Sequence, residues 1–150
     1  MTIAPVLQDI TTLLAHKISP DDTVVLVMLS GPKTSGSSTT VCFEIWEPGG
    51  SQPDNSHAES TETFVVLRGA GTAHSDEHTV ALSAGSVMVL PAGSVHRIVN
   101  TSESEKLYAI TVMENDCGFE DLILRGTPVA LPAEDASVLA ASGSFGTRPE

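Results

Sequence analysis

The sequence predicts an all-β fold, a barrel or sandwich of antiparallel strands with short helices at both ends. The 150 residues fit one domain, which we take as residues 1–150. Hydrophobic residues make up 41% of the chain and charged residues 17%, a composition typical of a globular protein. Between about 23 and 113, short β-rich runs alternate with turns that contain Gly, Pro, Asn or Asp. This region is therefore the expected barrel core.

The expected elements follow in order along the chain. Apolar residues at helical spacing from Val6 to Leu14 predict a short amphipathic helix. Strands are expected within residues 23–30, 39–47, 63–69, 78–82, 86–90, 95–100 and 106–113, with a flexible loop at 31–38. After Asp116 the pattern becomes helical and predicts a C-terminal extension over about 118–141. Residues 142–150 are expected to be a frayed tail.

The charge balance excludes several classes of partner. Nineteen acidic and seven basic side chains give a formal net charge of -12 at pH 7. Nucleic acids and anionic membrane surfaces both require clustered cations, so neither is an expected partner. The chain contains neither a membrane-spanning apolar run nor a signal-peptide pattern, and we expect a cytoplasmic location. Cys42 and Cys117 are far apart and are expected to be free thiols.

Two segments, residues 49–69 and 85–100, contain most of the residues with metal-binding chemistry. Asn55 and His57 share one face of an extended backbone, Glu62 opens the next apolar run, and His96 lies near the start of another. Taken alone, a strand histidine is more often a surface residue than a ligand. Together, two imidazoles and one carboxylate suit non-haem Fe(II), and Mn, Ni or Zn are also compatible. The Asn55 carbonyl oxygen can add a fourth, weaker ligand.

These two segments resemble the paired motifs of the cupin superfamily. The pattern G-x5-P-x-G-x2-H-x3-N is matched at Gly85, Pro91, Gly93, His96 and Asn100. The pattern G-x5-H-x-H-x4-E-x6-G is matched at Gly49, His57, Glu62 and Gly69, with Asn55 where the family usually has its first metal histidine. The resemblance implies an RmlC-like double-stranded β-helix, a jelly-roll barrel, with metal ligands at His57, Glu62 and His96. The alternative is that metal binding is lost and Asn55 hydrogen-bonds an organic ligand.

The remaining candidates depend on which strand faces line the barrel. If Glu44 and Trp46 face inwards, they shape the pocket and Glu44 is a candidate acid or base; otherwise Trp46 is an interface residue. Phe64 is a further candidate for the pocket and Tyr108 for catalysis. Other residues are expected outside the pocket: Arg97 opposite His96, His16 at the end of the first helix, and His74 and His78 around a hairpin tip.

The resemblance implies a metal-dependent enzyme that acts on a small organic molecule in the barrel, first of all a dioxygenase-type oxidoreductase. The expected cofactor is a divalent metal ion, with iron preferred. The alternatives are a cupin isomerase, cyclase or lyase, and a noncatalytic small-ligand-binding module, because fold alone does not decide function. A homodimer is expected, because the family resemblance favours one and an outer strand face rich in Val, Ile and Phe requires cover.

Overall fold

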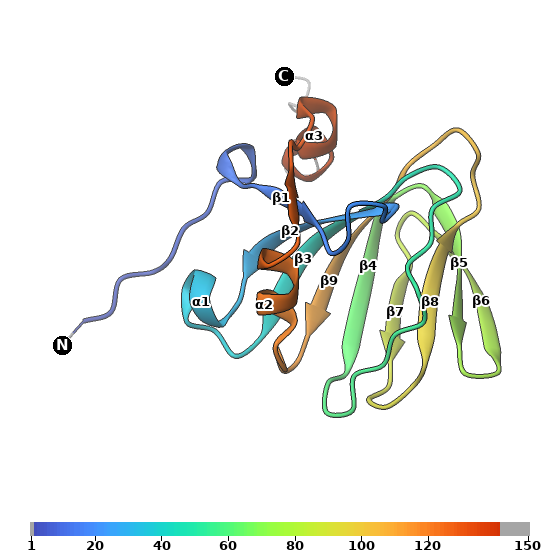
Figure 1. Cartoon of the computed structure of the whole chain (residues 1–150), viewed down its shortest axis with the longest axis horizontal. Coiled ribbons are helices and arrows are strands. Elements are labelled where there is room, and N and C mark those ends of the chain that lie inside the picture. The colour runs from blue at the N-terminus through green and yellow to red at the C-terminus, as the bar shows by residue number, and fades with distance from the viewer. Residues whose placement is uncertain (1, 142–150) are drawn as a thin grey trace, which may run out of the picture.

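The computed structural model describes residues 2–141 and contains two antiparallel β-sheets packed against each other (Figure 1). The larger sheet has the strand order β10-β1-β2-β3-β9-β4-β7, and the smaller sheet has the order β6-β5-β8. The strands of the larger sheet are β1 (Ala15–Lys17), β2 (Val24–Ser30), β3 (Thr40–Trp46), β4 (Glu62–Arg68), β7 (Val87–Leu90), β9 (Leu107–Met113) and β10 (Thr127–Val129). Those of the smaller sheet are β5 (Ala70–Ser75), β6 (His78–Ser83) and β8 (His96–Asn100). The predicted all-β class is confirmed.

All seven predicted strand runs are strands, and β1, β5 and β10 are strands that the sequence did not indicate. β5 has the sequence AGTAHS, which lacks the alternating large apolar residues that mark a half-buried strand. The C-terminal extension is helical only at α2 (Phe119–Leu124) and α3 (Ala133–Ala141), because β10 interrupts it and pairs with β1. The expected tail at residues 142–150 lies outside the described residues.

The expected N-terminal helix is reduced to one 3-10 turn, η1 (Ile10–Thr12). Val6 and Leu7 are 60% and 94% exposed, so their helical spacing has no apolar surface to pack against. A short helix without such packing is marginal in water, and the chain enters β1 instead. His16 consequently lies buried in β1 rather than at a helix end. Among residues 2–141, no helix is long and apolar enough to span a membrane.

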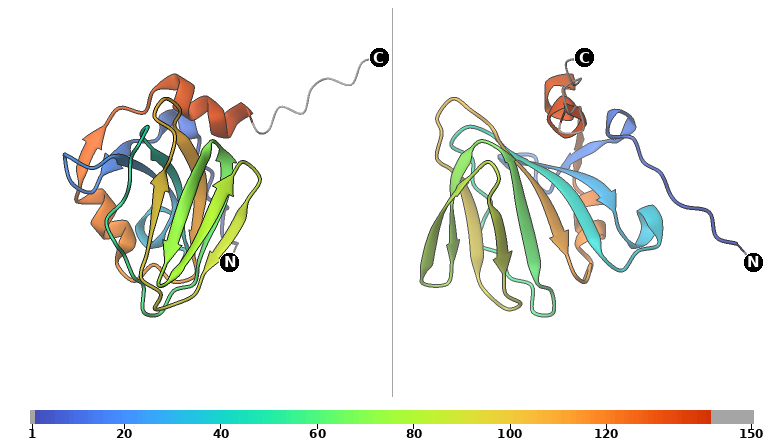
Figure 2. Two further views of the ribbon diagram at one scale, coloured as in Figure 1. Left: turned by 90° about the vertical axis from the view of Figure 1, so that its right-hand side faces the viewer. Right: turned by 180° about the vertical axis from the view of Figure 1, so that it is seen from behind.

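Alternation along β3 divides the apolar residues between two clusters. Cys42 and Trp46 face inwards, where they join a cluster that includes residues of the smaller sheet such as Ile98. Phe43 and Ile45 belong to a second cluster on the outer face of the larger sheet, against residues of α3. The left view of Figure 2 looks onto the smaller sheet, behind which the inner cluster lies. The face of β3 that carries Trp46 is therefore the inner one.

Helix α2 is attached to the short helix α1 (Pro32–Ser35) by a buried carboxylate. The Glu120 side chain is 1% exposed and accepts hydrogen bonds from the Lys33 amide at 2.6 Å and the Thr34 amide at 3.1 Å. The Thr34 hydroxyl also donates to Glu120, and the Lys33 ammonium pairs with Asp121. These contacts hold α2 against the inner side of the larger sheet, close to β1 and β2 (Figure 1).

We expect Glu120→Ala to lower the free energy of unfolding by about 2–4 kcal/mol, because three donors lose a charged acceptor. Urea unfolding followed by circular dichroism measures this loss. Glu134→Ala, which removes an exposed carboxylate from the first turn of α3, is the matched control and should change stability by less than about 0.5 kcal/mol. Equal effects of the two substitutions would show that Glu120 does not anchor α2.

Candidate metal centre

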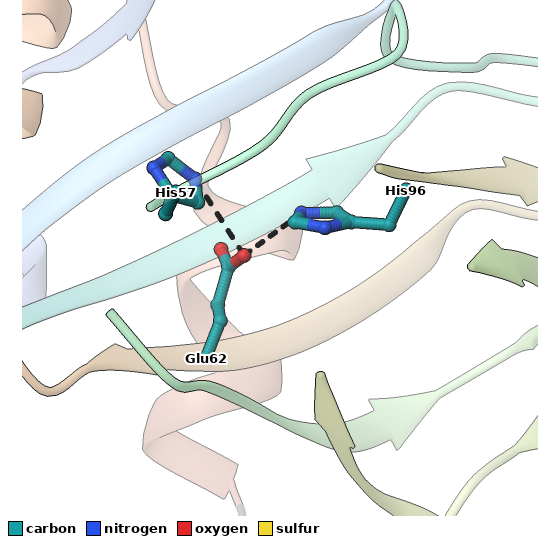
Figure 3. A group of neighbouring side chains, drawn as sticks. All are labelled: His57, Glu62 and His96. Atoms are coloured by element: carbon teal, nitrogen blue, oxygen red, sulfur yellow. Dashed lines mark ion pairs between the residues drawn. The ribbon is translucent and has the colours of Figure 1, made fainter. Parts of the chain in front are cut away.

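Three residues predicted from the sequence as metal ligands lie together between the sheets. His57 precedes β4, Glu62 begins β4 and His96 begins β8, and each offers a ligand atom within 4.8 Å of the others (Figure 3). Glu62 Oε2 lies 2.9 Å from His96 Nε2 and 3.6 Å from His57 Nε2. Glu62 and His96 are each 3% exposed. Two imidazoles and one carboxylate in this arrangement form a donor set suited to a divalent transition metal.

Main-chain pairing brings the two histidines together. The smaller sheet ends at β8, and the segment 50–57 runs along the free edge of that strand. Asn55 and His96 exchange two backbone hydrogen bonds of 2.8 Å, and the Gly93 amide donates to the His57 carbonyl at 2.8 Å. Gly93 has a φ of 84°, which favours glycine at the turn before β8. The histidine of each motif is thus held next to the other by backbone contacts.

The hydrogen bonds of His96 determine which ring nitrogen is available. Its Nδ1 lies 3.2 Å from the Ser94 carbonyl, which can only accept, so Nδ1 carries the proton. In the neutral imidazole, Nε2 then presents a lone pair to the carboxylate oxygen of Glu62. Both atoms are buried and neither has a hydrogen-bond partner. With Nε2 unprotonated, these two facing acceptors repel each other, and a metal ion bound by both atoms removes the repulsion, so the pair fits a bound metal ion.

His57 also favours the form that binds metals. Burial lowers the pKa of its imidazole, the charge of Glu62 acts in the opposite direction, and proximity to His96 lowers the pKa further. The neutral ring that results has a lone pair to offer a metal. The Phe119 ring packs edge-on against His57, with 5.7 Å between the ring centroids. Helix α2 therefore contacts the centre as well as covering the sheet.

Asn55 lies beside the three ligands but turns its oxygen away from them. Its Oδ1 accepts a hydrogen bond of 2.9 Å from the Ser56 amide, and its Nδ2 lies 3.0 Å from His57 Nε2. The Ser56 contact assigns the two ends of the amide, because a reversed side chain would bring two donors together. In this arrangement Asn55 donates a hydrogen bond to His57 Nε2, the nitrogen that faces Glu62, so Nε2 binds a metal only when this hydrogen bond opens. The sequence predicted an oxygen ligand at Asn55 instead.

A cavity of about 220 Å³ opens beside the centre. Glu62 and Asn55 line it from the centre, Glu44 from β3, and Phe119 and Leu122 from α2. Carboxylates and aliphatic or aromatic groups therefore share one wall. A small organic molecule that occupied this cavity would lie next to the ligand atoms of the centre.

Comparisons with known proteins agree with this architecture. The family model "Cupin domain" matches residues 42–113, which include all three candidate ligands. Residues 42–113 are therefore similar to a cupin domain. No curated protein matches the sequence of this chain.

Solved structures similar to this chain come from several organisms. A predicted oxalate decarboxylase from Thermotoga maritima is 21% identical, with 72% of this chain and 97% of that chain covered and a TM-score of 0.64. A Cupin 2 conserved barrel domain protein from Salinispora arenicola is 23% identical, with 81% and 95% covered and a TM-score of 0.57. A sugar phosphate isomerase from Silicibacter pomeroyi is 23% identical, with 61% and 59% covered and a TM-score of 0.53. These similarities show a shared fold.

Glu44 is a buried titratable residue in the cavity wall. It is 3% exposed, and burial raises the pKa of its carboxyl to about 8, with a further contribution from the charge of Glu62. A carboxyl with this pKa is largely protonated at neutral pH. It can therefore donate a proton to a bound molecule, or accept one after losing its own.

The other sequence candidates lie away from the cavity lining. Trp46 and Phe64 face the interior and pack against each other, with 6.3 Å between ring centroids, but neither lines the cavity. Tyr108 lies on the outer face of the larger sheet, where it stacks on Phe43 and donates a 2.8 Å hydrogen bond to Asp135. Burial, followed by this hydrogen bond, raises the pKa of Tyr108. Tyr108 was a candidate for catalysis on the sequence alone, but strand alternation directs it to the face opposite the cavity.

The predicted surface residues and thiols lie where the sequence placed them. Arg97 pairs with Asp54 at 3.0 Å and is 41% exposed. His74 and His78 flank the β5–β6 hairpin turn. Cys42 and Cys117 are free, as expected.

Several cavity residues escaped the sequence analysis. Asp22 lies in a turn and Asp54 in the irregular segment before Asn55, and only the fold brings them to the cavity. Phe119 and Leu122 are three residues apart, a spacing that indicates an apolar helix face but not that this face covers the centre.

We expect Glu44→Gln to stabilise the metal-free protein at high pH and leave it unchanged at low pH. Because folding raises the pKa of this carboxyl from 4.5 to about 8, ionisation costs stability progressively as the pH rises between those values. The variant should therefore gain about 2–4 kcal/mol over the native protein near pH 9, and almost nothing near pH 4. Denaturant midpoints at both pH values measure the difference. Glu114→Gln, an exposed control, should give the same small difference at both.

Proposed function

We propose that this chain is an enzyme that binds a divalent metal ion and acts on a small organic molecule inside the barrel. The observation that carries this proposal is the 2.9 Å approach of two buried, unpartnered acceptors, Glu62 Oε2 and His96 Nε2. With His57 nearby they form a three-ligand face, and the adjoining cavity leaves room for a substrate.

The donor set makes dioxygenase-type oxidoreductase chemistry the first candidate. Two histidines and one carboxylate with open positions suit Fe(II), and Mn, Ni or Zn are compatible with the same residues. When bound, iron would supply redox chemistry towards dioxygen, and any of these ions would act as a Lewis acid. The chain would hold the ion through His57, Glu62 and His96. Phe119 and Leu122 would exclude bulk water from one side of the substrate.

A proton-transfer reaction, as in an isomerase, cyclase or lyase, is the second candidate. Glu44 favours it, because a carboxyl with a pKa of about 8 in the cavity wall is suited to moving a proton at neutral pH. Solved structures with this fold include both a predicted oxalate decarboxylase and a sugar phosphate isomerase. Oxygen consumption during turnover distinguishes the first candidate, while anaerobic turnover that Glu44→Gln abolishes distinguishes the second.

We also propose that two copies of the chain associate. Ile3 and Leu7 are 92% and 94% exposed on an N-terminal segment that extends from the barrel, and Val87 and Val89 on the edge strand β7 are more than half exposed (Figure 1). Apolar side chains at a free sheet edge are commonly covered by another chain. The cytoplasmic location expected from the sequence stays a prediction.

Elemental analysis of protein purified without a tag or chelator tests the metal centre. We expect about one equivalent of a divalent transition metal per chain, and at least a roughly tenfold loss of affinity in His57→Ala and in His96→Ala. His74→Ala and His78→Ala are the matched controls and should leave the metal content unchanged. A folded protein that takes up no added metal, or ligand variants that bind as the native chain does, would contradict the proposal.

Asn55→His should raise the metal affinity by about tenfold or more. The Asn55 side chain already lies 3.0 Å from His57 Nε2, so an imidazole at this position adds a fourth donor beside the existing three. Competition with a chromophoric chelator measures the change. Asn115→His, at an exposed position outside the centre, is the control and should have no effect. An unchanged affinity in Asn55→His would place residue 55 outside coordination range.

A further inference from the structure

The charged side chains in the wall of the cavity beside the metal centre are all acidic. Asp22, Glu44, Asp54 and Glu62 line it. Among the residues that the structure describes, no lysine or arginine does so. The whole chain has a formal charge of -12, so no excess of positive charge elsewhere offsets this wall.

Two contacts show how the acidic charges are distributed. Asp54 forms an ion pair with Arg97, an exposed residue that does not line the cavity. Asp22 accepts a 2.9 Å hydrogen bond from the Ser19 amide, which orients its carboxylate without neutralising it. Asp22 therefore offers an unbalanced negative charge to anything that enters.

A second observation identifies the cavity as a binding site rather than a group of surface acids. Glu62 is 3% exposed, it lines the cavity, and its Oε2 lacks a hydrogen-bond partner. A buried carboxylate oxygen of this kind fits a bound cation. Under the proposed function, the metal ion is the cation at Glu62. Asp22 is not one of the metal ligands, so its negative charge is available to bind the substrate.

We propose that the substrate has a metal-binding group at one end, a short apolar middle and an ammonium group at the other. This inference rests on the proposed metal centre for the first end. Val24, Leu26, Phe119 and Leu122 supply the apolar contacts of the same cavity. Asp22, in the turn between β1 and β2 and partly exposed to solvent, receives the ammonium group.

The same charges disfavour anions. Recognition of a phosphate or a second carboxylate in proteins relies on arginine or lysine, which supply charge-assisted hydrogen bonds. The described wall of this cavity offers none, and Arg97 is already paired with Asp54. A ligand with an anionic group remote from the metal would meet the charge of Asp22 instead. Two negative charges repel each other more strongly in a cavity that is partly shielded from water than in bulk solvent. Sugar phosphates and extended dicarboxylates are therefore poor candidates.

Three hydroxamic acids of nearly equal length test the proposal, since each binds a metal through the same group. They are β-alanine hydroxamate, which ends in an ammonium group, butyrohydroxamate, which ends in a methyl group, and succinohydroxamate, which ends in a carboxylate. Calorimetric titration of the zinc-loaded protein measures their affinities. We expect the ammonium probe to bind at least about tenfold more tightly than the carboxylate probe, with the neutral probe between them. Equal affinities, or tighter binding of the carboxylate probe, would overturn the proposal.

Asp22→Asn tests the residue that receives the ammonium group. Asparagine keeps an oxygen for the Ser19 amide, so the turn is retained while the charge is removed. The preference for the ammonium probe should fall several-fold in this variant. Asp21→Asn, at the exposed neighbouring residue outside the cavity, should leave the preference unchanged. A preference that persists in both Asp22→Asn and Asp54→Asn would refute the assignment.

Failure of the metal centre can be told apart from failure of this inference. If the protein binds no zinc, the proposed function fails, and the cavity is then tested with butylamine, butanol and butyrate on the metal-free chain. Saturation-transfer NMR reports which of the three contacts the protein. Preferential contact with butylamine that Asp22→Asn abolishes supports the inference without the metal. Preferential contact with butyrate refutes it.

Discussion

The candidate site depends on the backbone pairing of segment 50–57 with the free edge of β8. Two isolated bridges, Ser51 to Val99 and Asn55 to His96, join an irregular segment to a regular strand. They satisfy main-chain groups that would otherwise remain open at the end of the smaller sheet. Beyond the second bridge the chain turns towards β4, and this turn directs His57 at Glu62. Side chains far apart in the sequence therefore meet because their backbones are already bound to each other.

The sequence predicted the regular strands and the ligand set because both have a local signature. Runs of large apolar residues marked β2, β3 and β9, and the motif spacing singled out His57 and His96. Packing between elements determined the parts of the fold that have no local signature. The N-terminal segment has helical spacing but no surface to pack against, and β5 forms from small residues because β6 and β8 flank it. The sequence alone did not show which face of β3 points inwards, because that depends on where the second sheet packs.

Asn55 illustrates how one substitution in a motif changes the role of a position. Its amide nitrogen faces His57, while its oxygen is held by the Ser56 amide. The same backbone bridge to His96 is made whichever side chain stands here, because the main chain alone supplies it. The motif can therefore lose an imidazole and keep its geometry. What changes is the number of donors around the centre and the hydrogen bonding of His57.

The anchoring of α2 by Glu120 lets two parts of the site evolve separately. The candidate ligands belong to β4, β8 and the segment paired with β8, whereas Phe119 and Leu122 belong to a helix fastened through α1. Exchanging either apolar residue alters the shape of the cavity without touching the carboxylate that secures the helix. Under the proposed function, exchanges at Leu122 change which molecules fit the cavity while the three candidate ligands stay in place. This separation between the candidate ligands and the cavity-lining helix is a route by which one barrel acquires new specificities.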